Sequence, residues 1–313
     1  MLKYLVTGGC GFIGSHVTDR LLEEGHQVRI LDNLVNSSTN YLPPQTDFVN
    51  GSITDKAILK QALEGIDGIF HLAALVSVTD SVDHWHDNHQ VNCSGTLCLL
   101  ELAQGLPIVF ASSAAIYGDT PELPQREETI PRSLSPYAID KLTCEMHLKL
   151  AWDLHRTPSA SFRFFNIYGP RQNPSSPYSG VISKFADLLT HRAPITIYGD
   201  GNQRRDFVYV KDVAQILVKT MSPNLSGGNI YNLCTGHSIS INELADLMGQ
   251  IAGVTVKKKR APARPGEILI SCGDPSKTLK TLGLQPRTTL TQGLTELLQF
   301  HRKNLEIPNT HPN

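Results

Sequence analysis

The sequence is short of cysteine, of net charge and of long apolar runs, and each shortage excludes a class of protein. Its six cysteines are scattered over 313 residues and form no C-x-x-C pair, so we expect no disulfide framework and no metal site. A formal net charge of −1 gives no reason to expect a nucleic-acid or anionic-membrane partner. No segment approaches the roughly 18 apolar residues of a membrane-spanning helix, and no signal-peptide layout is present, so we expect a cytoplasmic protein.

Short apolar segments alternate with segments of helical period through the first two-thirds of the chain. Strands are expected at 2–7, 27–31, 68–72, 108–111 and 161–165, and helices at 13–24, 55–63, 93–104 and 136–155. Later strands are expected at 195–198 and 229–233. The early strands are nearly continuous in apolar residues, which is typical of a sheet buried on both faces. The pattern therefore predicts an α/β fold with a doubly wound parallel sheet.

A glycine-rich turn joins the first strand to the first helix. Gly8, Gly11 and Gly14 permit a tight turn and close backbone approach, and the helix N-terminus that follows favours a pyrophosphate. Asp32 ends the second strand about 20 residues later, where a carboxylate accepts ribose hydroxyls and repels a 2′-phosphate. A purely structural turn with a solvated aspartate is the alternative. The placement favours a Rossmann-type domain that binds NAD.

The sequence pattern changes after Tyr168, because residues 169–180 are rich in turn-forming residues and have neither helical nor strand periodicity. We therefore expect an NAD-binding domain over 1–168, to which a segment at about 203–228 returns. The remainder, mainly 169–313, is expected to form a smaller C-terminal α/β substrate domain.

Tyr137 and Lys141 lie one helical turn apart and suggest hydride-transfer chemistry. A free tyrosine has a pKa near ~10, but a nearby ammonium and a positive nicotinamide favour the phenolate, which can accept a hydroxyl proton. Ser113, at a serine-rich strand end before this helix, can hydrogen-bond the reacting oxygen. The alternatives are a chance Y-x-x-x-K pattern and an ordinary polar loop.

Several further motifs occur in order along almost the whole chain. Together they make the chain resemble the extended short-chain dehydrogenase/reductase family, and within it the UDP-hexose 4-epimerases. Besides the residues above, the motifs are Leu31-Asp32-Asn33, His71-Leu72-Ala73-Ala74, Asn92, Ser112-Ser113-Ala114-Ala115-Ile116-Tyr117-Gly118, Arg163-Phe164-Phe165-Asn166-Ile167-Tyr168-Gly169-Pro170, Gly199-Asp200-Gly201, Arg205-Asp206-Phe207, Asp212-Val213-Ala214 and Arg264-Pro265-Gly266-Glu267.

The resemblance implies roles for these positions, with Ser113, Tyr137 and Lys141 as the catalytic residues. It implies contacts with NAD from Gly8, Gly11, Phe12, Ile13, Gly14, Asp32, Asn33, Ser52, Ile53, Leu72, Ala73, Ala74, Asn92, Tyr137 and Lys141. It implies contacts with a UDP-sugar from Ser77, Ser113, Asn166, Val181, Ile195, Tyr198, Arg205, Arg264, Glu267 and Ser271. Ser52 departs from the family pattern, in which an aspartate approaches adenine.

The residues at the strand end also bear on which reaction is expected. Relatives that dehydrate or decarboxylate carry an acid just before the Ile-Tyr-Gly of the strand end, but this chain has Ala114 and Ala115. We therefore expect C4 epimerisation through a 4-keto intermediate. Other nucleotide-sugar chemistry (a dehydratase, a decarboxylase or a 4-ketoreductase) and a non-catalytic NAD-sensing protein are the alternatives.

The resemblance also places Ser271 beside the 2-substituent of the sugar, where a small residue admits an acetamide. UDP-GlcNAc and UDP-GalNAc are thus the expected substrates, with UDP-glucose and UDP-galactose as slower ones. The other interpretation is that Ser271 merely ends a strand. A homodimer through the Tyr/Lys helix is also implied, although Leu142, Met146 and Leu150 would equally suit core packing.

Overall fold

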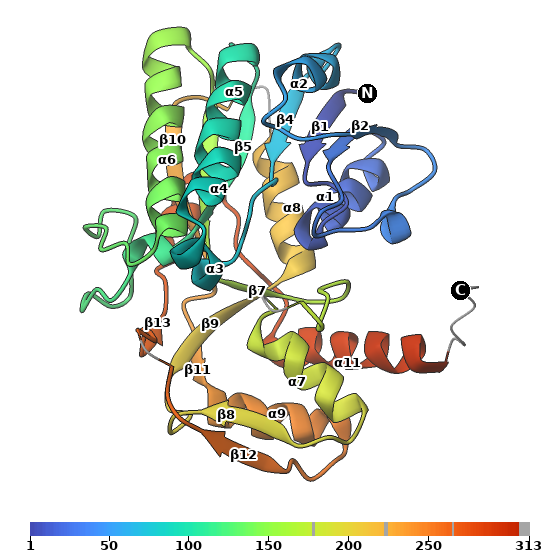
Figure 1. The fold of residues 1–313 in the computed structure, drawn as a ribbon, viewed down its shortest axis with the longest axis vertical. Coiled ribbons are helices and arrows are strands. Elements are labelled where there is room, and N and C mark those ends of the chain that lie inside the picture. The colour runs from blue at the N-terminus through green and yellow to red at the C-terminus, as the bar shows by residue number, and fades with distance from the viewer. Residues whose placement is uncertain (177–178, 222–224, 265, 307–313) are drawn as a thin grey trace.

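The computed structural model describes residues 1–176, 179–221, 225–264 and 266–306, which form a large sheet with helices on both faces and a smaller α/β region beside it (Figure 1). The large sheet has seven strands in the order β10, β6, β5, β4, β1, β2 and β3, and all neighbours are parallel. These strands are β1 (Lys3–Thr7), β2 (Gln27–Asp32), β3 (Asp47–Asn50), β4 (Gly68–His71), β5 (Ile108–Ser113), β6 (Ser159–Phe164) and β10 (Gly228–Leu233).

Alternate side chains of each central strand enter two different cores. Tyr4 and Val6 of β1 pack with the helices α1 (Phe12–Glu23) and α8 (Val210–Thr220) on one face. Leu5, between them, packs on the other face with α2 (Lys56–Leu63), α5 (Gly95–Leu102) and α6 (Pro136–His155). Both side-chain positions of the strands are therefore apolar, which explains the continuous apolar runs in the sequence.

The smaller region has its own hydrophobic core, formed by α7, α9, α11 and two small sheets. One sheet has the order β11-β9-β13 with β7 also paired to β9, and the other pairs β8 with β12. These elements are β7 (Asn166–Tyr168), α7 (Val181–Thr190), β8 (Ile195–Tyr198), β9 (Arg204–Tyr209), β11 (Ser238–Ser240), α9 (Ile241–Ala252), β12 (Lys258–Ala261), β13 (Ile270–Ser271) and α11 (Leu290–Glu306).

The remaining described elements are short. They are the helices α3 (Val78–Asp83), α4 (Trp85–His89) and α10 (Ser276–Leu282), the 3-10 helices Thr39–Tyr41 and Ala114–Tyr117, and the π-helical segment Gln90–Ser94. Within the described part of the chain, no helix combines the length and the apolar content that crossing a membrane requires.

The expected α/β fold with a doubly wound parallel sheet is confirmed, and the expected strands and helices of the first two-thirds are present with ends shifted by a few residues at most, apart from one helix. The helix expected at 93–104 is wrong at its start, because α4 and the π-helical segment continue it backwards to Trp85. β3 was not among the expected strands, since its four residues Asp47–Asn50 include two polar ones. The division into two domains stays a proposal, and the separate hydrophobic core of the smaller region supports it. Pro265 and residues 222–224, which belong to predicted segments, lie outside the described residues.

Candidate active site

A cavity of about 1360 Å³ lies at the carboxyl ends of the central strands. Its walls come from the ends of β1, β2, β4 and β5, from residues between 164 and 176, from Ser179 and Gly180, and from α7 and α11. The strand order reverses between β1 and β4, and open α/β sheets bind ligands at such a reversal. Most of the residues expected to contact NAD, together with Ser113 and Asn166, line this cavity.

The glycine turn closes tightly over the start of α1. Gly8 has a positive φ of 70°, and a Cβ atom there would lie 2.8 Å from the backbone N of Ala73. A Cβ atom on Gly14 would lie 2.1 Å from the carbonyl oxygen of Gly8. Side chains are therefore excluded at both positions, and the turn brings the backbone close to whatever occupies the cavity.

The N-terminus of α1 is open to an anion. Gly11 is the N-cap, no side chain caps the helix, and its first turn contains no acidic residue. The first backbone N–H groups of a helix have no partner within it and carry partial positive charge, which suits a pyrophosphate. This geometry fits the diphosphate of NAD.

Asp32 is buried at the end of β2 and lines the same cavity. Its carboxylate is oriented by three donors, the Cys10 N–H at 3.0 Å, the Leu34 N–H at 2.9 Å and the Ser37 hydroxyl at 2.8 Å. An ionised carboxylate has about four acceptor positions, so capacity remains for a ribose hydroxyl. Ser52 also lines the cavity, and its hydroxyl bonds that of Thr54 at 2.8 Å.

Residues 72–75 form the wall beside the glycine turn. The Thr7 hydroxyl accepts the N–H groups of Leu72 and Ala73 at 3.2 and 3.3 Å, which fixes this segment to β1. Asn92 does not line the cavity; its side-chain amide bonds the N–H and the carbonyl of Leu75 at 2.8 and 2.9 Å. In this structure Asn92 therefore positions the wall.

The N-terminal turn of α6 carries the residues expected to perform the chemistry. Ser135 caps the helix and Pro136 occupies its first turn, so Tyr137 and Lys141 project from a well-defined helix start. The Lys141 Nζ donates to the carbonyl of Ala111 at 2.7 Å and lies 5.9 Å from the centre of the Tyr137 ring. Ser113 lies close enough to the Tyr137 hydroxyl for a hydrogen bond between them to lower the pKa of the phenol. Three groups that could bind and relay one proton thus meet in the cavity.

Burial acts on both titratable groups of this cluster. It raises the pKa of Tyr137, and the hydrogen bond with Ser113 opposes that rise. It lowers the pKa of Lys141 from 10.5 to about 8, because the charged ammonium is taken out of water. A positive nicotinamide ring beside the phenol would favour the phenolate and so oppose the effect of burial.

A buried ion pair holds the strand ends behind this cluster. The Arg163 Nη2 donates to the Glu145 Oε2 at 2.7 Å, and the Ser112 hydroxyl donates to Glu145 Oε1 at 2.5 Å. Arg163 is on β6, Glu145 on α6 and Ser112 on β5, so the network joins three elements. It fixes the strand that presents Ser113 relative to the helix that presents Tyr137.

The residues expected to bind the diphosphate and sugar lie on adjacent strands of the smaller region. Asn166 of β7 lines the cavity and its amide donates to the Asp206 carbonyl of β9 at 3.0 Å. Ser271 of β13, which also pairs with β9, is in register with Arg205. The Arg205 guanidinium is half-buried and pairs with Glu267 at 3.4 Å. Asn166 and Ser271 therefore both lie on strands that pair with the strand of Arg205.

Of the expected substrate contacts, only Ser113 and Asn166 line the cavity, and Arg205, Glu267 and Ser271 do not. Arg264 stacks on the Tyr198 ring at 4.1 Å at the outer end of β8. Ser77 is the N-cap of α3 and accepts the Asp80 N–H at 2.9 Å. Val181 packs beside the core of the smaller region, and the side chain of Ile195 is fully buried in that core. Their roles stay predictions.

Arg171 lines the cavity and was not among the expected site residues. It pairs with Asp19 at 2.6 Å and stacks over Tyr41 at 4.9 Å, which ties residues 39–41 to α1. Its buried Nη1 atom has no hydrogen-bond partner among the described residues, so a donor remains for a ligand. An arginine within the turn-rich segment could have indicated a binding residue, but the sequence does not show that Asp19 lies beside Arg171.

Comparison with known proteins agrees with this geometry. Residues 4–234 match the model of the NAD dependent epimerase/dehydratase family. The UDP-glucose 4-epimerase of Mycolicibacterium smegmatis is 34% identical over 311 residues, covering 96% of this chain and 99% of that protein. A structure of Thermotoga maritima UDP-glucose 4-epimerase with UDP-glucose superposes with a TM-score of 0.94 at 34% identity, covering 97% of this chain and 100% of the other.

A second solved structure is of similar closeness. It is the UDP-N-acetylglucosamine 4-epimerase of Methanobrevibacter ruminantium in complex with UDP-N-acetylmuramic acid, with a TM-score of 0.92, 32% identity and coverage of 97% and 99% of the two chains. The chain therefore belongs to the NAD dependent epimerase/dehydratase family, within the extended short-chain dehydrogenase/reductase group. The resemblance stated from the motifs is confirmed, and so is NAD as the cofactor.

Proposed function

We propose that this member of the NAD dependent epimerase/dehydratase family epimerises C4 of a UDP-hexose, with UDP-GlcNAc and UDP-GalNAc as its preferred pair. One observation carries the choice of reaction: the cavity offers a tyrosine beside Ser113 and Lys141 but no carboxylate at that end. Among the described lining residues the acids are Asp32, three strands away on β2, and Asp187 on α7. Elimination and decarboxylation need an additional acid or base, whereas oxidation and re-reduction at C4 need only one proton relay.

The chain's own residues would perform the following steps. Tyr137 accepts the proton of the C4 hydroxyl, Ser113 hydrogen-bonds the same oxygen, and the Lys141 ammonium stabilises the phenolate. NAD, when bound, would supply the acceptor and the donor for the C4 hydride. Between the two transfers, the nucleotide end of the substrate stays bound while the 4-ketose turns its other face to the cofactor. Tyr137 then returns the proton.

The diphosphate would be held by Asn166, Arg205 and Arg264. A guanidinium matches the fixed oxygens of a phosphate through paired hydrogen bonds. Arg205 is half-buried, and desolvation lowers its pKa while Glu267 opposes the effect, so the pair with Glu267 keeps this guanidinium charged and oriented. A diphosphate bound beside Arg205 would accept hydrogen bonds from the remaining guanidinium N–H groups.

Ser271 supports the acetylated substrate. Its position in register with Arg205 puts a small side chain one strand away from the proposed diphosphate ligand. A small side chain leaves room for an acetamide, whereas a large one would require strain of about 1–3 kcal/mol. The Ser271 side chain is half-buried and does not line the cavity, so its contact with the sugar is part of the proposal.

The test is to incubate the purified chain separately with UDP-GlcNAc and UDP-glucose and to follow the products by NMR. We expect UDP-GlcNAc to equilibrate with UDP-GalNAc, and UDP-glucose to react more slowly. Turnover of UDP-glucose alone would contradict the substrate. Loss of mass from the sugar, or a need for added NAD(P)H, would instead identify a dehydratase, decarboxylase or ketoreductase, and inertness with bound NAD would identify a non-catalytic protein.

The variant Ser271→Tyr separates substrate choice from catalysis. We expect it to lower turnover of UDP-GlcNAc by about ten- to a hundredfold, which corresponds to strain of 1–3 kcal/mol, and to leave UDP-glucose turnover within a few-fold. Ser271→Ala is the matched control, because it keeps the position small, and it should retain both activities. Equal turnover of UDP-GlcNAc by Ser271→Tyr and the parent would show that Ser271 is not the gate.

We further propose a homodimer formed through α6. Ile139, Met146, Leu150 and Leu154 are exposed on this helix, although each is large and apolar. An exposed apolar patch of this kind marks a protein–protein contact. Light scattering should give twice the chain mass, and Met146→Asp should shift the population to monomer. A monomeric parent at micromolar concentration would refute the dimer.

A further inference from the structure

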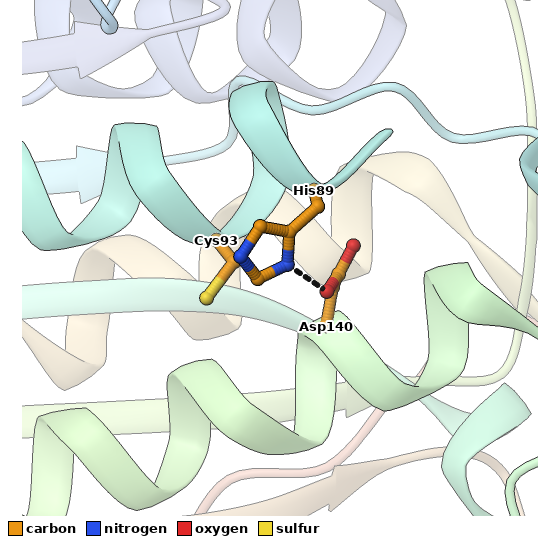
Figure 2. Close-up of side chains that lie close together, drawn as sticks. All are labelled: His89, Cys93 and Asp140. Carbon is orange, nitrogen blue, oxygen red and sulfur yellow. Dashed lines mark hydrogen bonds and ion pairs between the residues drawn. The ribbon is translucent and has the colours of Figure 1, made fainter. Parts of the chain in front are cut away.

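Outside the cavity, three metal-ligating side chains meet between two helices. His89 ends α4, Cys93 is in the π-helical segment that follows it, and Asp140 is in α6. One donor atom from each residue lies within 4.8 Å of the other two. Figure 2 shows the His89 imidazole between the Cys93 sulfur and the Asp140 carboxylate. We propose that His89, Cys93 and Asp140 bind a thiophilic divalent transition metal ion of the zinc class.

The spacing of the donors suits such an ion. Zinc lies about 2.0–2.3 Å from nitrogen, oxygen and sulfur ligands, so two ligands of a tetrahedral ion are about 3.3–3.8 Å apart. The His89 Nδ1 is 2.8 Å from the Asp140 Oδ1, so these two atoms would separate by a fraction of an ångström. Cys93 would approach by a rotation of its side chain. Small adjustments of three side chains would therefore suffice.

The surroundings of Asp140 resemble those of a built ligand. The Asn88 amide donates to the Asp140 Oδ2 at 2.6 Å, which leaves Oδ1 directed at the cluster. Asn88 is itself held by the Asn92 amide at 3.0 Å. Outer hydrogen bonds of this kind orient metal-binding carboxylates and contribute to affinity. Both Asp140 and Cys93 are buried.

The position also allows a metal to enter. The His89 side chain is 52% exposed, so the cluster has one face open to solvent, where water could supply the fourth ligand. The Cys144 thiol is a neighbour of Cys93, but it donates to the Asn92 carbonyl at 3.3 Å. We therefore assign Cys144 to the surroundings of the site. The π-helical segment that carries Cys93 is a further sign, since such segments often occur at functional sites.

The donor set determines the class of ion. A thiolate with an imidazole selects zinc and its neighbours over magnesium or calcium, which prefer oxygen ligands. The structure otherwise accounts for His89 and Asp140 as a hydrogen-bonded pair between α4 and α6, but that pair does not require a thiol beside it. The three residues do not line the cavity, so this proposal does not depend on the proposed epimerase function.

Cobalt(II) is the probe, because it reports its ligands by absorption. The full-length chain, reduced and freed of metal, would be titrated with Co²⁺ and the spectrum recorded. We expect one equivalent to bind with a sulfur-to-cobalt charge-transfer band and with visible bands of tetrahedral intensity. One equivalent of Zn²⁺ should then bleach both, because zinc binds more tightly than cobalt to such sites. Mg²⁺ should have no effect.

Matched variants locate the ion. Cys93→Ser should abolish the charge-transfer band, and His89→Gln and Asp140→Asn should each weaken Co²⁺ binding more than tenfold. Cys98→Ser and His86→Gln are the controls, since these residues lie on the neighbouring helical segments but outside the cluster, and the parent spectrum should persist in both. Far-UV circular dichroism and NAD content verify that each variant folds; His89→Gln, at an exposed position, keeps the test valid if a buried variant misfolds.

Three results would overturn the proposal. They are the absence of a charge-transfer band in the parent chain, its survival in Cys93→Ser, and an affinity in His89→Gln equal to that of the parent. Loss of the band in Cys98→Ser to the same extent as in Cys93→Ser would also place the ion elsewhere.

Discussion

The two ends of the cavity differ in the groups that face the ligand. At the cofactor end, the glycine turn, the N-terminus of α1 and the buried carboxylate of Asp32 belong to the large sheet. Near the substrate end, the charge expected to meet the diphosphate is on the side chains of Arg205, on β9, and Arg264, which are half-buried and exposed and do not line the cavity. One end thus presents mainly backbone, and the other presents mainly side chains.

This difference indicates whether a single substitution changes cofactor binding or substrate binding more easily. Backbone N–H groups are presented by the fold itself, so a single substitution removes them only by distorting the turn. Side chains on short strands can be exchanged while the sheet stays intact. Within one family, the cofactor should therefore be constant, whereas the choice of sugar can vary. Substitutions at the two ends should accordingly affect different measured quantities.

Tyr137 lies between the two ends of the cavity, and its substitution is expected to have the largest effect on turnover. Tyr137→Phe removes the group that accepts and returns the C4 proton, so kcat should fall by about 10²–10⁴. The amount of NAD that copurifies should stay the same, because the aromatic ring remains. Epimerisation is followed by NMR and NAD by absorbance after denaturation. Full activity in Tyr137→Phe would assign the proton transfer to another group.

Lys141 sharpens the contrast, because it is a fully buried cation at the cofactor end. Its pKa of about 8 lies below the ordinary 10.5, so between these values the unfolded chain binds more protons than the folded chain. Stability that depends on Lys141 therefore increases as pH rises from about 8 to 10.5, by up to about 3 kcal/mol. Below pH 8 the buried charge is a constant cost.

The measurement is the difference in free energy of unfolding between the parent and Lys141→Met across that pH window. The variant should be favoured relative to the parent at and below pH 8, and the difference should shift toward the parent as pH rises. Lys149→Met is the control, because it makes the same replacement at an exposed position of the same helix. A pH-independent difference for Lys141→Met would show that burial does not depress this lysine.

The glycine turn tests backbone presentation directly. Gly8 and Gly25 have similar positive φ values, 70° and 78°, so alanine costs each about 1–3 kcal/mol of backbone strain. Only at Gly8 would the added Cβ meet other atoms, with Ala73 N at 2.8 Å, whereas nothing lies within 4 Å at Gly25. Gly8→Ala should therefore weaken NAD binding about tenfold or more, and Gly25→Ala should lower only the melting temperature. Equal NAD affinity in both variants, measured by calorimetry, would contradict a close backbone approach.

Features formed by neighbouring residues could be predicted from the sequence, whereas contacts between distant segments could not. Helix α6 coincides with the expected 136–155, because Ser135 and Pro136 begin it and Arg156 ends it with a left-handed residue, all within one local segment. The glycine turn and Asp32 are likewise read from neighbouring residues and one strand end. These features depend on local sequence, which is why the fold and the cofactor were predicted correctly.

Long-range contacts could not be predicted in this way. Arg171 pairs with Asp19 across most of the NAD-binding region, and Cys93 meets Asp140 only after α4 and α6 pack together. Scattered cysteines without a C-x-x-C pair gave no sign of that cluster. The register that aligns Ser271 with Arg205 depends on a two-residue strand, which no periodicity reveals. Such pairings are decided by tertiary packing.

Arg205 is the counterpart of Gly8 at the substrate end, and its expected effect is the smallest. Arg205→Lys keeps the charge but loses the paired hydrogen bonds of a guanidinium, so KM for the UDP-sugar should rise about tenfold, or about 1.4 kcal/mol, with kcat and NAD content unchanged. Arg204→Lys is the control, because Arg204 bonds Ser238 and Glu243 instead of Glu267. Its KM should equal that of the parent. An equal rise in both variants would show that general charge at β9, and no specific diphosphate contact, governs substrate affinity at this end of the cavity.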